Sequence, residues 1–162
     1  LALAAGLMHK PRLFFLDEPT TGVDPVSRRE FWQMLYRLNK EGMTVFVSTP
    51  YMDEAELCTR VAFMHEGRIV SCASPAQLRA AYPYKILELA VGGREVKKVL
   101  QDCNLVDINA FGEKYHLATR EPEQARAMAA AALTRAGFAG FTLTDVEPTL
   151  EDVFVALAGE AR

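Results

Sequence analysis

Two adjacent acidic residues, Asp17 and Glu18, follow directly on an apolar run in the stretch "RLFFLDEPTTGVDP". A continuous apolar run of this kind is typical of a strand buried on both faces, as in a parallel sheet. Two carboxylates at the end of such a strand are costly unless they meet a cation or water. An aspartate there is well placed to hold Mg²⁺ beside nucleotide phosphates, and an adjacent glutamate can orient a water for in-line attack.

The same acidic pair has a plainer interpretation, in which both residues cap a helix after a proline turn. Four apolar residues precede the pair and "PTTGVDP" follows it, and this context favours the chemical interpretation.

A second strand end carries polar residues in "VFVSTPYMDEAE", residues 45–56. The apolar run ends at Ser48-Thr49, Pro50 follows, and the next residues predict a short helix whose first-turn acids suit the helix dipole. Loops at the carboxyl ends of neighbouring parallel strands usually hold the chemistry of an α/β protein. We therefore expect the two junctions to belong to one site.

The elements around these junctions predict an α/β layout with a mostly parallel sheet over residues 1–83, because apolar strands alternate with helical segments. The helix between the junctions has Asp24 as a candidate N-cap, Pro25 at its first position and Gly42 at its end. The aromatic pairs Phe14-Phe15 and Phe31-Trp32 are predicted to pack in the core. The stretch "SRRE" at 27–30 is predicted to be a solvated helix start.

A second domain is predicted over residues 84–162. Its elements follow the order β-α-β-β-α-β with a final helix, and this order matches a split βαβ, ferredoxin-like, α+β arrangement. The strand pair at its centre is predicted to turn at Gly112-Glu113.

Composition excludes several classes of function. The formal net charge is −3, so general attraction to nucleic acid or to anionic lipid is not expected. Three widely spaced cysteines and three scattered histidines predict neither a disulfide framework nor a zinc site, and they fit a reducing cytoplasm. No apolar run approaches the roughly 20 residues of a membrane span.

At this point the chain resembles a known family. "LFFLDEPTTGVDP" is similar to the Walker B motif and D-loop of ATP-binding cassette (ABC) ATPases, and "STPYMDEAE" falls where their switch loop falls. "MHEGRIVSCASPAQL" is similar to the strand pair and short helix that follow. The final phrase "PTLEDVFVALAG", residues 148–159, resembles the C-terminal extension of the ABC-2 type multidrug and daunorubicin-resistance exporters.

The resemblance implies a role for each matching residue. Asp17 would be the carboxylate on the magnesium side, acting through water, and Glu18 the catalytic carboxylate that polarises the attacking water. Asp24 would face the partner cassette from the D-loop. ATP and Mg²⁺ would be the ligands of the complete protein.

Two departures from the family pattern stand out. The printed sequence has no GxxxxGK[ST] phosphate loop, Q-loop or LSGGQ-type signature. We expect these to lie N-terminal to Leu1 and expect the chain alone to bind ATP weakly or not at all. The switch histidine of the family falls at position 50, where this chain has Pro50. Proline has neither a side-chain donor nor a backbone N–H, so a degenerate, slow ATP site is expected.

The resemblance implies an ATPase component, paired with a second cassette, that powers export of a drug-like or lipid-like molecule through a separate integral-membrane permease. It would lie in the cytoplasm on the inner face of the cell membrane. Two alternatives stay open: a non-transport ABC ATPase, and a regulatory or interaction module in which the ATPase remnant is only scaffold. We also expect self-association through open sheet edges.

Overall fold

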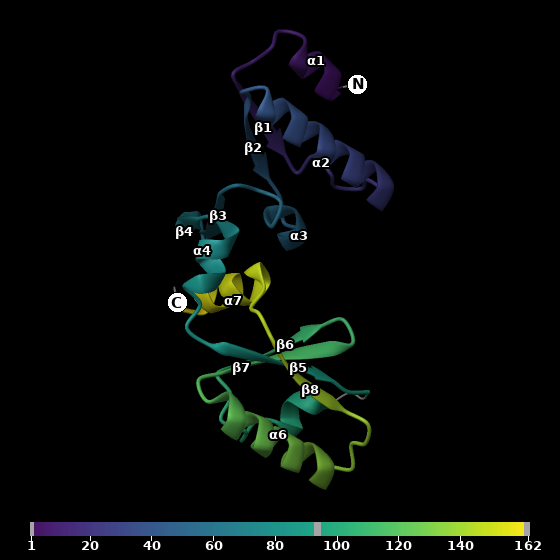
Figure 1. Ribbon diagram of the computed structural model, residues 1–162, viewed down its shortest axis with the longest axis vertical. Coiled ribbons are helices and arrows are strands. Elements are labelled where there is room, and N and C mark those ends of the chain that lie inside the picture. Colours follow the sequence, from purple (N-terminus) through teal and green to yellow (C-terminus); the bar gives the residue numbers. More distant parts are fainter. Residues whose placement is uncertain (1, 93–94, 161–162) are drawn as a thin grey trace. The chain divides into compact units, whose positions relative to one another are not determined.

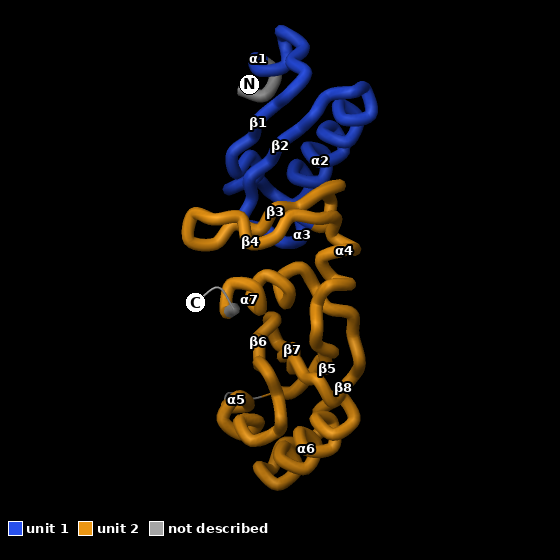
Figure 2. Tube along the Cα trace, turned by 90° about the vertical axis from the view of Figure 1, so that its left-hand side faces the viewer, with its two compact units in different colours: residues 1–55 blue, residues 56–162 orange. Residues whose placement is uncertain are grey.

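The computed structural model describes residues 2–92 and 95–160 (Figure 1). In chain order its elements are α1 (Ala2–Leu7), β1 (Leu13–Asp17), α2 (Pro25–Lys40), β2 (Thr44–Ser48), α3 (Met52–Ala55), β3 (Val61–His65), β4 (Arg68–Ala73), α4 (Pro75–Ala80), β5 (Lys85–Ala90), α5 (Val96–Val99), β6 (Asp107–Phe111), β7 (Lys114–Thr119), α6 (Pro122–Arg135), β8 (Thr142–Val146) and α7 (Leu150–Glu160). The mixed α/β class predicted from the sequence is confirmed. The chain forms two compact units, residues 1–55 and 56–162 (Figure 2).

The first unit is built on a parallel strand pair. β1 and β2 are joined through α2, and their register runs from Leu13 opposite Thr44 to Asp17 opposite Ser48. Helix α2 packs against β2 and buries Trp32 and Leu35. The connection therefore places the carboxyl ends of both strands side by side, as the two junctions in the sequence predict.

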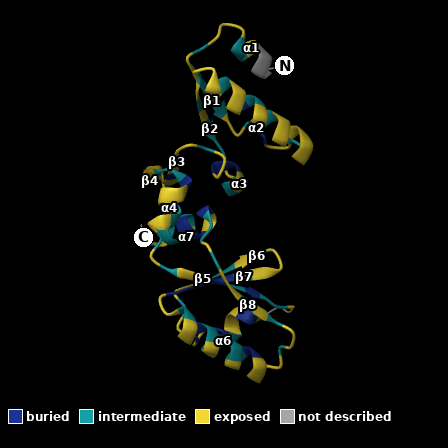
Figure 3. Ribbon diagram, viewed as in Figure 1, coloured by how far each residue is buried: buried dark blue, intermediate teal, exposed yellow. Residues whose placement is uncertain are grey.

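The prediction that these strands are buried on both faces is wrong within the described residues. Alternate residues of β1 and β2 are exposed (Figure 3), among them Leu13, Phe15 and Phe46. Phe15 was expected to pack, but it is 66% exposed, and its ring lies tilted beside that of Phe46 on the neighbouring strand, at 5.5 Å between centroids. One face of the pair is covered and the other is not.

The second unit contains a four-stranded antiparallel sheet of order β6-β7-β5-β8. The elements follow the predicted order β-α-β-β-α-β, and the split βαβ, ferredoxin-like arrangement stays a prediction. The predicted turn at Gly112-Glu113 joins β6 to β7. Helices α5 and α6 cover one face of the sheet, where Leu87, Leu117 and Leu133 form the core with Cys103.

The final helix, α7, packs against α4 and β4. The Phe154 ring of α7 lies 5.3 Å from that of Phe63 in β3. Residues 56–83 therefore belong to the same compact unit as the sheet, and the division of the chain into domains 1–83 and 84–162 stays a prediction.

Candidate functional site

Asp17 and Ser48 lie opposite each other at the ends of β1 and β2. The Ser48 hydroxyl donates a short hydrogen bond to Oδ1 of Asp17. Asp17 is an exposed residue at the end of its strand. The parallel pairing therefore orients the side chain of Asp17 and leaves it accessible from solvent.

Glu18 is held by the same serine. Its backbone N–H lies 3.0 Å from the carbonyl oxygen of Ser48 and 3.2 Å from its hydroxyl oxygen. Glu18 adopts φ 41°, a left-handed conformation that is uncommon for residues other than glycine. The Thr21 hydroxyl donates to Oε2 of Glu18 at 3.2 Å, so both the backbone and the carboxylate of Glu18 have fixed partners.

Asp24 caps helix α2, as its position before Pro25 predicts. Its Oδ1 accepts hydrogen bonds from the N–H groups of Val26 and Ser27, each at 3.0 Å. Hydrogen bonding from the Ser27 side chain, with the backbone N–H groups, lowers the pKa of Asp24 below its ordinary value of 3.8. The structure thus gives Asp24 a local role, and its contact with a partner cassette stays a prediction.

Pro50 lies two residues beyond Ser48 on an exposed turn. The turn is held on both sides of the proline through Thr49, whose hydroxyl oxygen accepts from the N–H of Tyr51 at 3.1 Å. Pro50 therefore has a defined position, although it offers no hydrogen-bond donor.

The sequence did not predict the role of Glu54. This carboxylate was expected to favour the dipole of a helix, but in α3 it is 1% exposed. It accepts from the Thr20 hydroxyl at 2.6 Å and from the Thr49 hydroxyl at 2.7 Å. The sequence did contain a sign of these hydrogen bonds, because each of the two loops holds a threonine: Thr20 in the loop after β1, and Thr49 directly after β2.

Arg28 is the exception in "SRRE", whose other three residues are exposed as predicted for a solvated helix start. Its Nε lies 3.6 Å from Oε1 of Glu54, and its Nη1 lies 3.6 Å from Oδ2 of Asp53. The guanidinium also lies over the Tyr51 ring, 4.7 Å from its centroid. Helix α2 thus supplies a positive charge to the loop after β2.

Magnesium suits the donors at this site. Among the residues that the structure describes, no group of three or more histidine, cysteine or acidic side chains is arranged to hold a metal ion. Mg²⁺ keeps several waters and binds through one or two carboxylates plus substrate phosphates. An accessible Asp17 carboxylate, already oriented by Ser48, fits that mode of binding.

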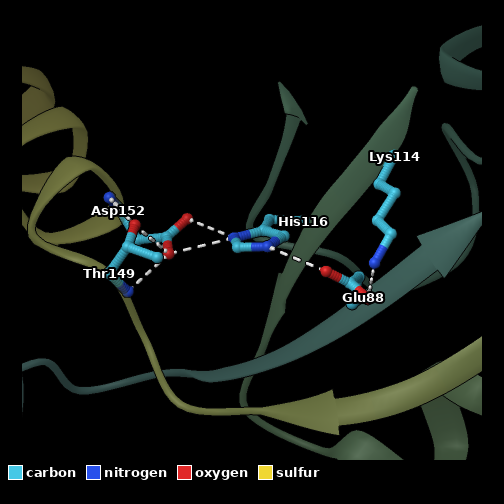
Figure 4. Close-up of polar contacts among 5 residues, drawn as sticks. All are labelled: Glu88, Lys114, His116, Thr149 and Asp152. Carbon is cyan, nitrogen blue, oxygen red and sulfur yellow. Dashed lines mark hydrogen bonds and ion pairs between the residues drawn. The ribbon is translucent and has the colours of Figure 1, made fainter. Parts of the chain in front are cut away.

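A second polar cluster lies in the unit of residues 56–162 (Figure 4). Nδ1 of His116 lies 3.0 Å from both carboxylate oxygens of Asp152, and its Nε2 lies 3.8 Å from Oε2 of Glu88. Asp152 also accepts from the Thr149 N–H and hydroxyl, at 2.8 Å each. The cluster attaches α7 to the sheet.

Within residues 2–92 and 95–160, no helix is both long enough and apolar enough to span a bilayer.

No family model matches the chain. The chain is 34% identical over 161 residues to the Nod factor export ATP-binding protein I of Rhizobium sp. (strain N33), covering 98% of this chain and 51% of the relative. It is 34% identical over 167 residues to the daunorubicin/doxorubicin resistance ATP-binding protein DrrA of Streptomyces peucetius, with 98% and 50% covered. The chain belongs to the family of ABC transporter ATP-binding proteins.

A shorter match is stronger. Over 80 residues the chain is 49% identical to the probable multidrug ABC transporter ATP-binding protein YbhF of Escherichia coli (strain K12), covering 49% of this chain and 14% of the relative. The chain spans about half the length of the two ABC proteins that it matches from end to end. The resemblance to the drug-resistance exporters is confirmed, since DrrA matches the chain along nearly its whole length.

Proposed function

We propose that this chain supplies the Walker B, D-loop and switch-loop part of the ATP site in the ATP-binding subunit of an ABC exporter. The observation that carries the proposal is the arrangement of Asp17, Glu18 and Ser48 at adjacent ends of β1 and β2. The remaining parts of the site, above all the phosphate loop, would come from other residues of the complete protein.

In this proposal the two carboxylates have separate tasks. Asp17, whose carboxylate is oriented by the Ser48 hydroxyl, would hold Mg²⁺, through water as the resemblance implies, and the ion would supply positive charge beside the nucleotide phosphates. Glu18 orients and polarises the attacking water, and the Thr21 hydroxyl limits the positions of its carboxylate. Pro50 supplies no donor at the switch position, so we propose that this site turns over slowly.

The partners follow from the family. We propose a second ABC cassette, which closes on this one when ATP binds, and an integral-membrane permease whose movement exports a drug-like or lipid-like molecule. The chain would then lie on the cytoplasmic face of the membrane through the permease. The name of the Nod factor export protein supports export, and the name of DrrA supports a link to drug resistance.

Single-turnover ATP hydrolysis in the complete protein tests this function. We expect Glu18→Gln to lower the rate by about 100-fold or more, the size of a general-base contribution, while ATP binding is retained. We expect Pro50→His to raise the rate, by up to about 100-fold if the new donor reaches the transition state. An unchanged rate in Glu18→Gln would contradict the ATPase role, and no gain in Pro50→His would contradict the degenerate site.

One observation favours a second candidate, an interaction module that keeps the ATPase fold as scaffold. Pro50 removes the donor at the switch position. This candidate predicts that the complete protein binds no ATP, which equilibrium dialysis with labelled nucleotide measures directly.

A further inference from the structure

Glu54 is a buried carboxylate to which the proposed reaction assigns no task. Only 1% of the residue is exposed, and an ionised carboxylate out of water is costly unless charge and hydrogen bonds compensate it. Here the Thr20 and Thr49 hydroxyls donate to its two oxygens at 2.6 and 2.7 Å. The loop that holds Thr20 and the loop that holds Thr49 therefore both fix the position of the Glu54 carboxylate.

The two threonines lie in the loops that carry the proposed chemistry. Thr20 is two residues beyond Glu18, in the turn where the N–H of Val23 donates to the Thr20 carbonyl at 3.0 Å. Thr49 lies between Ser48 and Pro50. One carboxylate thus joins the loop after β1 to the loop after β2.

The charge on Arg28 anchors this connection to α2. Its Nε lies 3.6 Å from Oε1 of Glu54, and this nitrogen is buried without a hydrogen-bond partner in the part of the chain that the structure describes. The guanidinium is oriented by the Tyr51 ring below it. Glu54 and Arg28 attract each other, and because the Glu54 side chain is buried and that of Arg28 is 28% exposed, water screens the attraction less than at the open surface.

We propose that Glu54 is a positioning residue for hydrolysis: by joining Thr20 to Thr49, it holds the Glu18 loop and the switch loop in one arrangement. This role deepens the proposed function and rests on it. Position 50 is a proline, so neither its side chain nor its N–H can hold the switch loop against a phosphate. The bond from Thr49 to Glu54 holds the loop instead, within the protein.

Conservative variants of the complete protein test this role. Thr20→Val and Thr49→Val keep the shape of the side chain and remove the hydroxyl, whereas Thr20→Ser and Thr49→Ser keep the hydroxyl. Loss of alignment at a site costs up to about 100-fold in rate. We expect each valine variant, and Glu54→Gln and Glu54→Ala, to lower the single-turnover rate by about 10- to 100-fold, and each serine variant to stay within about threefold of wild type.

Measuring the affinity for ATP separately from the hydrolysis rate distinguishes a positioning role from destabilisation of the fold. We expect the dissociation constant for ATP to change by less than about threefold in the valine variants, since no group on the nucleotide is removed. Asp53→Asn is the matched control, because Asp53 is the other acid beside Arg28 and its side chain is 72% exposed. It should leave the rate unchanged.

The possible outcomes separate the two proposals. If Glu18→Gln lowers the rate while the folded valine variants hydrolyse ATP at the wild-type rate, the role of Glu54 is wrong and the ATPase function stands. If the serine variants lose as much as the valine variants, the hydroxyl bridge is likewise refuted. If wild type shows no hydrolysis that depends on Glu18, the proposed function fails and the positioning role fails with it.

Discussion

Glu18 has a strained backbone conformation at the end of β1. Side chains alternate between the two faces along a strand, so a continued strand would direct Asp17 and Glu18 to opposite faces. The left-handed φ of 41° ends this alternation directly after Asp17. Such conformations cost about 1–3 kcal/mol and occur where the surroundings enforce them. The two hydrogen bonds from the Glu18 N–H to Ser48 supply that enforcement.

The stabilisation that the Asp24 side chain gives to helix α2 is predicted to depend on pH. Its pKa lies below the ordinary 3.8, chiefly because the Ser27 side chain bonds to the carboxylate. A lowered folded-state pKa means that the stabilisation is present above pH 3.8 and is lost as the pH falls through the folded-state pKa. We expect Asp24→Ala to have a lower urea midpoint than wild type at pH 7, and the difference to shrink as the pH falls below 3.8.

The control for this prediction is Asp24→Asn, which keeps an oxygen acceptor at the N-cap and does not titrate. Its urea midpoint should stay closer to wild type at pH 7 than that of Asp24→Ala. A difference between wild type and Asp24→Ala that is equally large at pH 7 and at the most acid pH would show that the ionised cap contributes nothing.

Residues with local partners could be predicted from the sequence, and those with distant partners could not. Asp24 caps the helix that begins at the next residue, and the position of Asp17 follows from the strand before it. Glu54 bonds to Thr20 across 34 residues of sequence, so its burial depends on how β1 and β2 pair. The same holds for Arg28, which looked solvated because its partners lie in another loop.

At the scale of elements, the alternation of strands and helices was sufficient to predict the α/β class and the hairpin of β6 and β7. It did not predict which strand faces are covered. An apolar run indicates that a strand can be buried on both sides, but coverage depends on neighbours that the run does not specify. Phe15 and Phe46 are exposed for this reason.

The attachment of α7 to the sheet gives a prediction for an element. His116 lies on β7 and is 6% exposed, and Asp152 lies in the first turn of α7 and is 2% exposed. Removing one partner of a buried polar pair leaves the other uncompensated. We expect His116→Ala to lower the free energy of unfolding by about 3 kcal/mol, measured by urea denaturation monitored by circular dichroism.

Two further variants identify the cause of that loss. In a double-mutant cycle with Asp152→Asn, the two losses should not add, because both variants remove the same contact. Lys114→Ala removes only the exposed bond to Glu88 and should have little effect. Additive losses from His116→Ala and Asp152→Asn would show that the histidine supports α7 by packing alone, through the Phe111 ring stacked on it at 4.1 Å between centroids.

At the scale of the whole molecule, the two units differ in how they are stabilised. Residues 56–162 contain a continuous core between the sheet and helices α5 and α6. Residues 1–55 rest on a two-stranded sheet, and two strands alone are marginally stable in water. The buried hydrogen bond from Thr20 to Glu54 adds a polar contact to the first unit.

The exposed apolar face of that strand pair leads to the last prediction. Leu13, Phe15 and Phe46 are 47%, 66% and 58% exposed on neighbouring strands, and edges and faces of this kind promote pairing with another chain. We expect the chain to self-associate, with a mass by multi-angle light scattering that rises with concentration.

Phe46→Glu should shift the equilibrium toward monomer, because a charge on this face opposes burial. Val26→Glu, at a position 69% exposed on α2, is the matched control and should associate like wild type. A monomeric mass for wild type at the highest concentration attainable would refute the association, and equal effects of both variants would assign it to general charge rather than to this face.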